Sequence, residues 1–197
     1  MTTRKNAFYG ILALVSLLGL GITQSARANL ITNGDFETGD FTGWTVSPPH
    51  SGSLLFVLHG FGPDTTFGAF FGATDHQFDT ISQSFATTPG ARYNLSFFYQ
   101  VTNTDLIADN HFVVLFNGVN IFDNLDANPG YGTFTFNNLL ATSSLTTLEF
   151  EGYNTPAFDF LDDVSVTPAG VPDAGSTLSL LSLALLGVAV LRRKLRC

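Results

Sequence analysis

The fold is decided by a ten-residue stretch, RYNLSFFYQV at residues 92–101, in which apolar side chains recur at every second position. Successive side chains of a β-strand point to opposite faces, so one face of this stretch is entirely apolar. The other face is polar except for Phe98. The alternation therefore predicts a strand that buries one face in a hydrophobic core, made by Tyr93, Leu95, Phe97, Tyr99 and Val101.

Similar patterns recur on both sides of this stretch, throughout residues 29–170. Short apolar runs alternate with turn sequences such as Pro89-Gly90 and Asn117-Gly118, and no segment shows sustained helical periodicity. About 140 residues suffice for one hydrophobic core. We therefore expect one all-β domain at 29–170, an antiparallel β-sandwich, with further strands at 54–58, 67–71, 80–85, 111–116, 132–136, 146–150 and 158–167.

Charge is distributed unevenly along the chain. Residues 29–170 contain 15 acidic residues and a single basic residue, Arg92, so their formal charge is −14. Binding to nucleic acid needs clustered Lys and Arg, which argues against a nucleic-acid partner. The single cysteine, Cys197, excludes a disulfide or a cysteine-ligated zinc site within one chain.

Residues 1–28 have the three parts of a secretory signal peptide. Arg4 and Lys5 precede an uncharged apolar stretch at 8–22, and small residues follow at Ala26 and Ala28. We expect export through the secretion translocon and cleavage between Ala28 and Asn29; the alternative is an uncleaved membrane anchor.

Residues 171–197 form a second targeting pattern. The motif Val171-Pro172-Asp173-Ala174-Gly175 precedes a 15-residue uncharged run, Thr177–Leu191, and then a basic cluster. Such a run is about 22 Å long as a helix, which makes a short span for a hydrocarbon core of about 30 Å. The basic cluster would remain on the cytoplasmic side, which places the acidic domain outside the inner membrane.

This C-terminal pattern resembles the PEP-CTERM sorting tails of bacteria, in the variant whose motif reads Val-Pro-Asp-Ser-Gly. Ala174 replaces the serine of that motif. The resemblance implies recognition by an exosortase, a membrane peptidase that cuts near the motif. It also implies an inner-membrane intermediate and then delivery to the cell surface or extracellular matrix of a Gram-negative-type bacterium. A plain single-pass anchor is the alternative.

One carboxylate is expected on the core face of the final strand. Strict alternation places Asp162 with Phe160, Val164 and Val166, whereas Asp163 faces the other way. A buried carboxylate must be neutralised, hydrogen-bonded or bound to a cation. Because Arg92 is the only basic residue of the domain, Ca²⁺ is the natural partner.

Three segments resemble the galactose-binding-like jelly rolls, a group that includes several carbohydrate-binding modules. They are NGDFETGDFTGW at 33–44, ISQSFATTPG at 81–90 and LDDVSV at 161–166. The resemblance implies a jelly-roll sandwich whose first and last strands lie close together. It also implies a structural calcium held by Glu37 and Asp162, with backbone oxygens near Gly34 or Asp35. The alternative is that Glu37 and Asp35 are solvated turn residues and Asp162 is hydrogen-bonded.

Catalytic motifs are absent from the sequence: it has no Gly-x-Ser-x-Gly, no His-Glu-x-x-His and no phosphate loop. Its four histidines show no metal-ligand spacing and are interpreted as ordinary surface or loop residues. Exposed aromatic side chains can stack on sugars, and the candidates are Trp44, Phe98, Tyr131 and Tyr153, although Trp44 is expected in the core.

Together these patterns favour a non-catalytic exported protein of the cell surface or matrix, processed by an exosortase, with exopolysaccharide as a candidate partner. The alternative is a lectin-like carbohydrate-binding module that recognises a specific glycan. A degradative enzyme is the third hypothesis.

Overall fold

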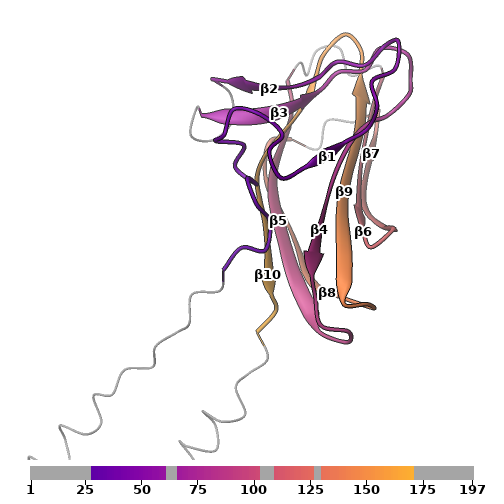
Figure 1. The fold of residues 1–197 in the computed structure, drawn as a ribbon. Coiled ribbons are helices and arrows are strands. Elements are labelled where there is room, and N and C mark those ends of the chain that lie inside the picture. Colours follow the sequence, from indigo (N-terminus) through magenta and orange to yellow (C-terminus); the bar gives the residue numbers. More distant parts are fainter. Residues whose placement is uncertain (1–27, 61–65, 103–108, 127–129, 171–197) are drawn as a thin grey trace, which may run out of the picture.

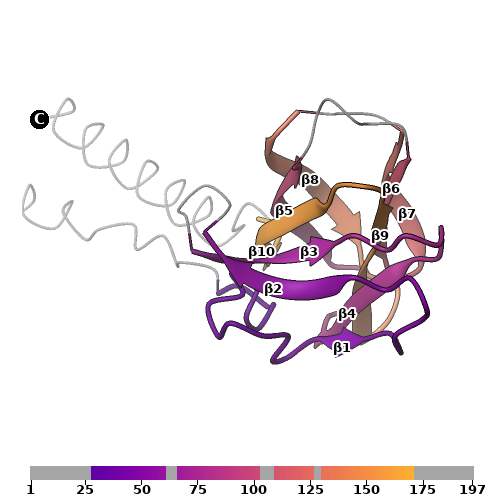
Figure 2. The same ribbon diagram turned by 90° about the horizontal axis from the view of Figure 1, so that it is seen from above.

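The computed structural model describes residues 28–60, 66–102, 109–126 and 130–170. These residues form two five-stranded antiparallel sheets packed face to face, with no helix among them (Figures 1 and 2). Sheet A has the strand order β1-β4-β9-β6-β7, and sheet B has the order β2-β3-β10-β5-β8. The strands are β1 (Thr45–Val46), β2 (Leu55–His59), β3 (Phe67–Phe71), β4 (Asp79–Ala86), β5 (Arg92–Val101), β6 (Asn110–Phe116), β7 (Val119–Leu125), β8 (Gly132–Leu140), β9 (Leu145–Asn154) and β10 (Asp159–Pro168). The predicted all-β sandwich is confirmed.

The stretch at 92–101 is strand β5, with the bounds and the face predicted from its alternation. Leu95, Phe97 and Tyr99 are fully buried between the sheets, and Tyr93 and Val101 join them in the main core. Phe97 makes an edge-to-face contact with Phe150 of sheet A, with ring centroids 5.4 Å apart. Inward aromatic side chains of β5 therefore hold the two layers together.

Two strands were not predicted, β1 and β7. Strand β7 follows β6 through a tight turn in which Asn117 and Gly118 have φ angles of 53° and 75°. Asn-Gly at such angles is typical of a two-residue hairpin turn. The turn was identified from sequence, but the strand after it was missed because β7 lies at a sheet edge and four of its seven residues are exposed.

The beginning and the end of the domain lie side by side. Residues 29–35 lie along β10, with backbone hydrogen bonds from Leu30 N to Val166 O and from Val164 N to Gly34 O, both 2.8 Å. A Cβ on Gly34 would lie 2.1 Å from the carbonyl oxygen of Val164, so only glycine permits this approach. The resemblance implied that the first and last strands lie close together. In the structure the segment at 29–35 lies against the last strand, β10, whereas the first strand, β1, pairs with β4 in sheet A.

Strand β10 corrects the face assigned to Asp162. Its register with β5 shifts between Asp162 and Ser165, and Asp163 has a φ of 52°. This β-bulge interrupts the alternation. Leu161, Val164 and Val166 point into the main core, whereas Phe160 belongs to a separate cluster of rings. The prediction that Asp162 shares one face with Val164 and Val166 is wrong, although its side chain is buried.

The predicted signal peptide, residues 1–28, lies outside the described residues except for Ala28. The predicted tail, residues 171–197, lies wholly outside them. Within the described part of the chain, no helix is long and apolar enough to cross a membrane.

Candidate functional site

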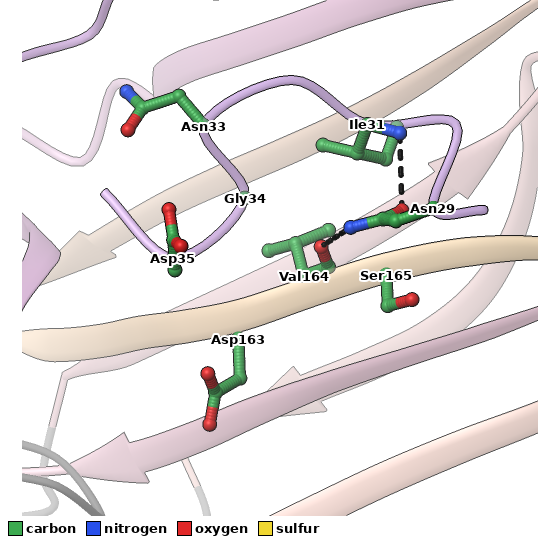
Figure 3. A pocket seen from close by; sticks show the side chains of 8 residues that line it. All are labelled: Asn29, Ile31, Asn33, Gly34, Asp35, Asp163, Val164 and Ser165. Atoms are coloured by element: carbon green, nitrogen blue, oxygen red, sulfur yellow. Dashed lines mark hydrogen bonds between the residues drawn. The ribbon is translucent and has the colours of Figure 1, made fainter. Parts of the chain in front are cut away.

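A shallow, polar pocket of about 270 Å³ lies where residues 29–35 meet β10 (Figure 3). The Asn29 side chain fastens the two segments together. Its Nδ2 donates to Val164 O (3.0 Å), and its Oδ1 accepts from the backbone amides of Ile31 (3.0 Å) and Val166 (2.9 Å). The lining comprises Asn29, Ile31, Asn33, Gly34, Asp35, Asp163, Val164 and Ser165.

The four residues predicted to bind calcium divide between this pocket and the adjacent end of β3. Gly34 and Asp35 line the pocket, whereas Glu37 and Asp162 do not. Glu37 Oε1 accepts a hydrogen bond from the backbone amide of Phe67 (2.9 Å). Because Ala69 of β3 pairs with Leu161 of β10, Phe67 lies at the end of the strand pair toward Asp162. Glu37 and Asp162 therefore lie toward the same end of the β3–β10 strand pair, which we call the corner of sheet B.

This corner presents carboxylate and carbonyl oxygens, which are the ligands that a hard cation takes. Asp162 is only 1% exposed, and its Oδ1 accepts from the backbone amide of Asp163 (2.7 Å). No three His, Cys, Asp or Glu side chains form a metal-binding group anywhere in the described ranges. A calcium ion here would therefore need backbone carbonyl oxygens beside its two carboxylates, as the resemblance implied.

The four aromatic residues that the sequence suggested as sugar-stacking candidates differ in their exposure to solvent. Trp44 is 7% exposed and stacks on Phe36 in the core, with ring centroids 5.7 Å apart, as expected. Phe98 is also 7% exposed and therefore offers no ligand surface. Tyr131 is 78% exposed, and Tyr153 is half-buried on the outer face of sheet A.

Phe98 belongs to a second aromatic cluster, separate from the main core. Phe160 is its fully buried centre, and its ring lies over Gly68 of β3, where a Cβ would approach it to 2.3 Å. Gly72 makes the same room for Phe158. Because glycine has no side chain, the rings of Phe160 and Phe158 pack directly on the backbone of Gly68 and Gly72. This contact explains how the two rings are packed outside the main core. The cluster contains Phe56, Phe70, Phe98, Phe158 and Phe160.

Sheet A carries a different arrangement on its outer face, which we call the aromatic patch: His76, Phe78, His111 and Tyr153. The Phe78 ring lies 5.0 Å from His111 and 5.4 Å from Tyr153, and His76 lies 5.5 Å from Tyr153, measured between ring centroids. Phe78, His111 and Tyr153 are half-buried, and His76 is exposed. The patch thus offers several neighbouring ring surfaces to solvent.

Strand pairing explains how the patch forms. His111 of β6 pairs directly with Tyr153 of β9, and Phe78 immediately precedes β4, the strand on the other side of β9. The sequence identified Tyr153 but treated the histidines as ordinary surface residues. Outward parity of Tyr153 was visible in the sequence, whereas the neighbours that complete the patch depend on strand order.

Acidic side chains surround the aromatic patch. His111 Nε2 lies 2.9 Å from Asp123 Oδ1, and His76 Nε2 lies 3.3 Å from Asp109 Oδ2. Along β9, Glu151 faces outward two residues from Tyr153, and its pKa is raised by burial and then by the charge of Glu149. These carboxylates supply hydrogen-bond acceptors beside the rings.

A group of serine, histidine and aspartate side chains joins the β1–β2 and β3–β4 loops. The two ring nitrogens of His50 face two different carboxylates: Nδ1 lies 2.9 Å from Asp75, and Nε2 lies 3.3 Å from Asp79. Ser51 and Ser53 donate their hydroxyls to these same two carboxylates. A nucleophilic serine needs its hydroxyl bonded to the histidine, so this group fastens loops and does not form a catalytic triad.

Comparison with known proteins gives two kinds of similarity. Residues 170–195 match the VPDSG-CTERM motif, a tail that indicates a sorted, exported protein. No curated protein sequence matches the chain.

The fold is similar to that of several solved structures. TmCBM61 in complex with β-1,4-galactotriose matches with a TM-score of 0.53 and 15% identity, covering 72% of this chain and 99% of that one. The CBM22-1 xylan-binding domain of Paenibacillus barcinonensis Xyn10C matches with a TM-score of 0.51 and 16% identity, covering 74% and 97%. The K1 cleaved adhesin domain of Lys-gingipain from Porphyromonas gingivalis W83 matches with a TM-score of 0.54 and 14% identity, covering 69% and 96%. At these identities the likeness concerns the fold alone: the domain is a jelly-roll sandwich, like these solved structures.

Proposed function

We propose that this chain is a non-catalytic, exported surface protein that binds a glycan through the aromatic patch on sheet A. The observation that carries the proposal is the meeting of Phe78, His111 and Tyr153 rings on an outer sheet face. Two proteins of similar fold are a module in complex with a galactotriose and a xylan-binding domain, which supports a carbohydrate as the ligand class.

The physical chemistry of the patch suits a sugar. Binding sites for small ligands combine apolar or aromatic walls with a few polar groups that fix orientation. Here the rings would cover the apolar C–H face of a sugar, while outward acceptors such as Glu151 and Asp123 would accept hydrogen bonds from its hydroxyl groups. The acidic surroundings would disfavour a polyanionic glycan.

The sorting tail supports the second half of the proposal. We propose that an exosortase cleaves near Val171–Gly175 after the translocon has exported the chain, and that the basic end holds the uncleaved intermediate in the inner membrane. The released domain would then reside at the surface or in the extracellular matrix, where exopolysaccharide is the available glycan.

We also propose a structural calcium ion at the corner of sheet B, held by Glu37 and Asp162 with backbone oxygens near Gly34 or Asp35. The burial of Asp162 and the position of Glu37 on Phe67 support this assignment. The ion would pin the opening loop to β3 and β10, which is a structural and not a catalytic role.

A glycan array with the purified protein tests the proposed function. Binding to one class of polysaccharide is expected, with loss of at least about fivefold in affinity for Tyr153→Ala, because central aromatic contacts usually contribute more than about 1 kcal/mol. Tyr131→Ala is the matched control, since Tyr131 is exposed but outside the patch. No binding to any glycan, or equal loss in both variants, would contradict the proposal.

A further inference from the structure

A group of buried polar side chains crosses the core at one end of the sandwich. We call it the polar clasp: Tyr99, Asn110, Asn124, Asn154 and Asp159. Asp159 and Asn110 are fully buried, and Asn154 is 1% exposed. The members come from β5 and β10 of sheet B and from β6, β7 and β9 of sheet A, so the clasp joins the two layers by hydrogen bonds.

The hydrogen bonds of Asp159 are strongly asymmetric. Its Oδ1 accepts from the Tyr99 hydroxyl at 2.6 Å, from Asn154 Nδ2 at 3.4 Å and from Asn110 Nδ2 at 3.5 Å. Its Oδ2 is buried and has no donor within the described residues. The side-chain oxygen of Asn110 is also buried and lacks a donor there. Asp159 and Asn110, which are joined by one hydrogen bond, thus each have a buried oxygen that lacks a donor within the described residues.

From this pattern we infer that Asp159 is a neutral carboxylic acid in the folded protein and that it forms a cyclic pair with Asn110. In this pair the Asn110 amide donates to Oδ1 of Asp159, and the carboxyl proton on Oδ2 is donated to the oxygen of Asn110. One proton, taken from solvent, satisfies both of these buried oxygens, and the pair then carries no charge. The pair therefore gives both buried groups the partners that burial demands.

The opposite amide orientation does not solve the problem. If the Asn110 amide were turned over, its oxygen would face Oδ1 of Asp159, which already accepts from Tyr99. Burial, the largest influence, also raises the pKa of Asp159 to about 7, although the hydrogen bonds from Tyr99, Asn110 and Asn154 lower it.

Among the described residues, the other side chains that contact Asp159 are neutral. Strand β5 presents the Tyr99 phenol, whose own pKa is raised by burial, and β6 and β9 present the amides of Asn110 and Asn154. Asn124 of β7 donates to the Tyr99 hydroxyl. On the other side, Asp159 pairs in the sheet with Phe71 of β3. Ionisation of Asp159 would therefore place an uncompensated charge between the sheets and break the cyclic pair. The clasp is a pH-sensitive fastening that is closed when Asp159 is protonated.

Equilibrium unfolding tests this inference. It is measured from pH 4 to pH 9 for the purified protein and for its Asp159→Asn variant. The asparagine keeps the shape, leaves an acceptor for Tyr99 and donates to Asn110 without a titrating proton. The pKa of Asp159 is 3.8 in the unfolded chain and about 7 in the folded one. The free energy of unfolding of the wild type should therefore fall, relative to that of the variant, as the pH rises. The ratio of the two unfolding constants should change by up to tenfold per pH unit within that window and level off above it.

Comparison with the variant removes the contribution of the other ionisable groups, because both proteins contain them. A ratio that does not vary with pH between 4 and 7 would overturn the inference, because Asp159 would then carry the same charge folded and unfolded.

Infrared spectroscopy of the folded wild type provides a second readout that does not require the variant to fold. A protonated carboxyl carbonyl band is expected at pH 5 to 6 and should disappear as pH rises through about 7. Asp79→Asn is the matched control. Asp79 is 1% exposed, but its two oxygens accept from Ser53 and from the Leu54 amide, so this substitution should leave the band in place. Absence of the band at pH 5 to 6 would overturn the inference.

Discussion

The backbone amide of Val164 donates to the carbonyl oxygen of Gly34 across 2.8 Å, which fastens the first segment of the domain to its last strand. Two residues that are far apart in the sequence thereby become neighbours at the pocket of Figure 3. The relationship depends on glycine, because the Val164 carbonyl occupies the space of any side chain at position 34.

Gly34→Ala should destabilise the domain by more than about 2 kcal/mol, since either the segment or β10 must move to accommodate the methyl group. Thermal unfolding measures the loss. Gly130→Ala is the control, because its added Cβ would meet nothing within 4 Å and only its positive φ of 86° carries a penalty of about 1 kcal/mol. Equal losses in the two variants would show that the close approach to Val164 is unimportant.

Tyr99→Phe should destabilise the folded domain by about 1–3 kcal/mol, because it removes a hydroxyl that donates to Asp159 and accepts from Asn124. Denaturant unfolding gives the value. Tyr131→Phe should change stability by less than about 0.5 kcal/mol, since its side chain is exposed. If Tyr99→Phe is as stable as wild type, the clasp does not contribute to holding the sheets together.

Calcium should raise the melting temperature through Glu37 and Asp162. At a concentration one hundred times its Kd, an ion that binds only the folded state contributes about 2.7 kcal/mol, and chelation should reverse the shift. Magnesium should substitute poorly because it requires a tighter octahedral shell. Differential scanning calorimetry is the measurement.

Two comparisons make the calcium prediction specific. Glu37→Gln or Asp162→Asn should abolish the shift, whereas Asp163→Asn should largely spare it, because only Asp162 of this pair is buried. Sodium at matched ionic strength controls for screening of the charge of −14 on residues 29–170. The site is refuted if sodium acts as well as calcium, or if both variants retain the full shift.

The mature protein should lack its C-terminal tail. Mass spectrometry of surface material should find a C-terminus close to Val171–Gly175 and no peptide containing Cys197. An intact 192–197 peptide on most molecules would favour a permanent anchor over exosortase processing.

The sequence predicted what depends on local periodicity. The alternation of β5 was sufficient to predict its bounds and its buried face, because this strand is an inner strand of sheet B with one face in the main core. The same reasoning was wrong for Asp162, because one bulged residue with positive φ at Asp163 reverses parity and leaves no trace in hydrophobicity.

Features that depend on strand order could not be predicted from the chain. The aromatic patch brings together residues from β6, β9 and the start of β4, and the polar clasp brings together five strands. Asn154 illustrates the difficulty: it lies two residues before Pro156, yet it is the last residue of β9 and is buried against Asp159.

Calorimetric titration with the glycan selected on the array tests the central claim most directly. The affinity is measured for the purified wild type and for three variants. Phe78→Ala and Tyr153→Ala should each weaken binding by at least about fivefold, while Tyr131→Ala should bind like wild type. Wild-type affinity in both patch variants, with a folded sandwich, would contradict the assignment of glycan binding to the aromatic patch.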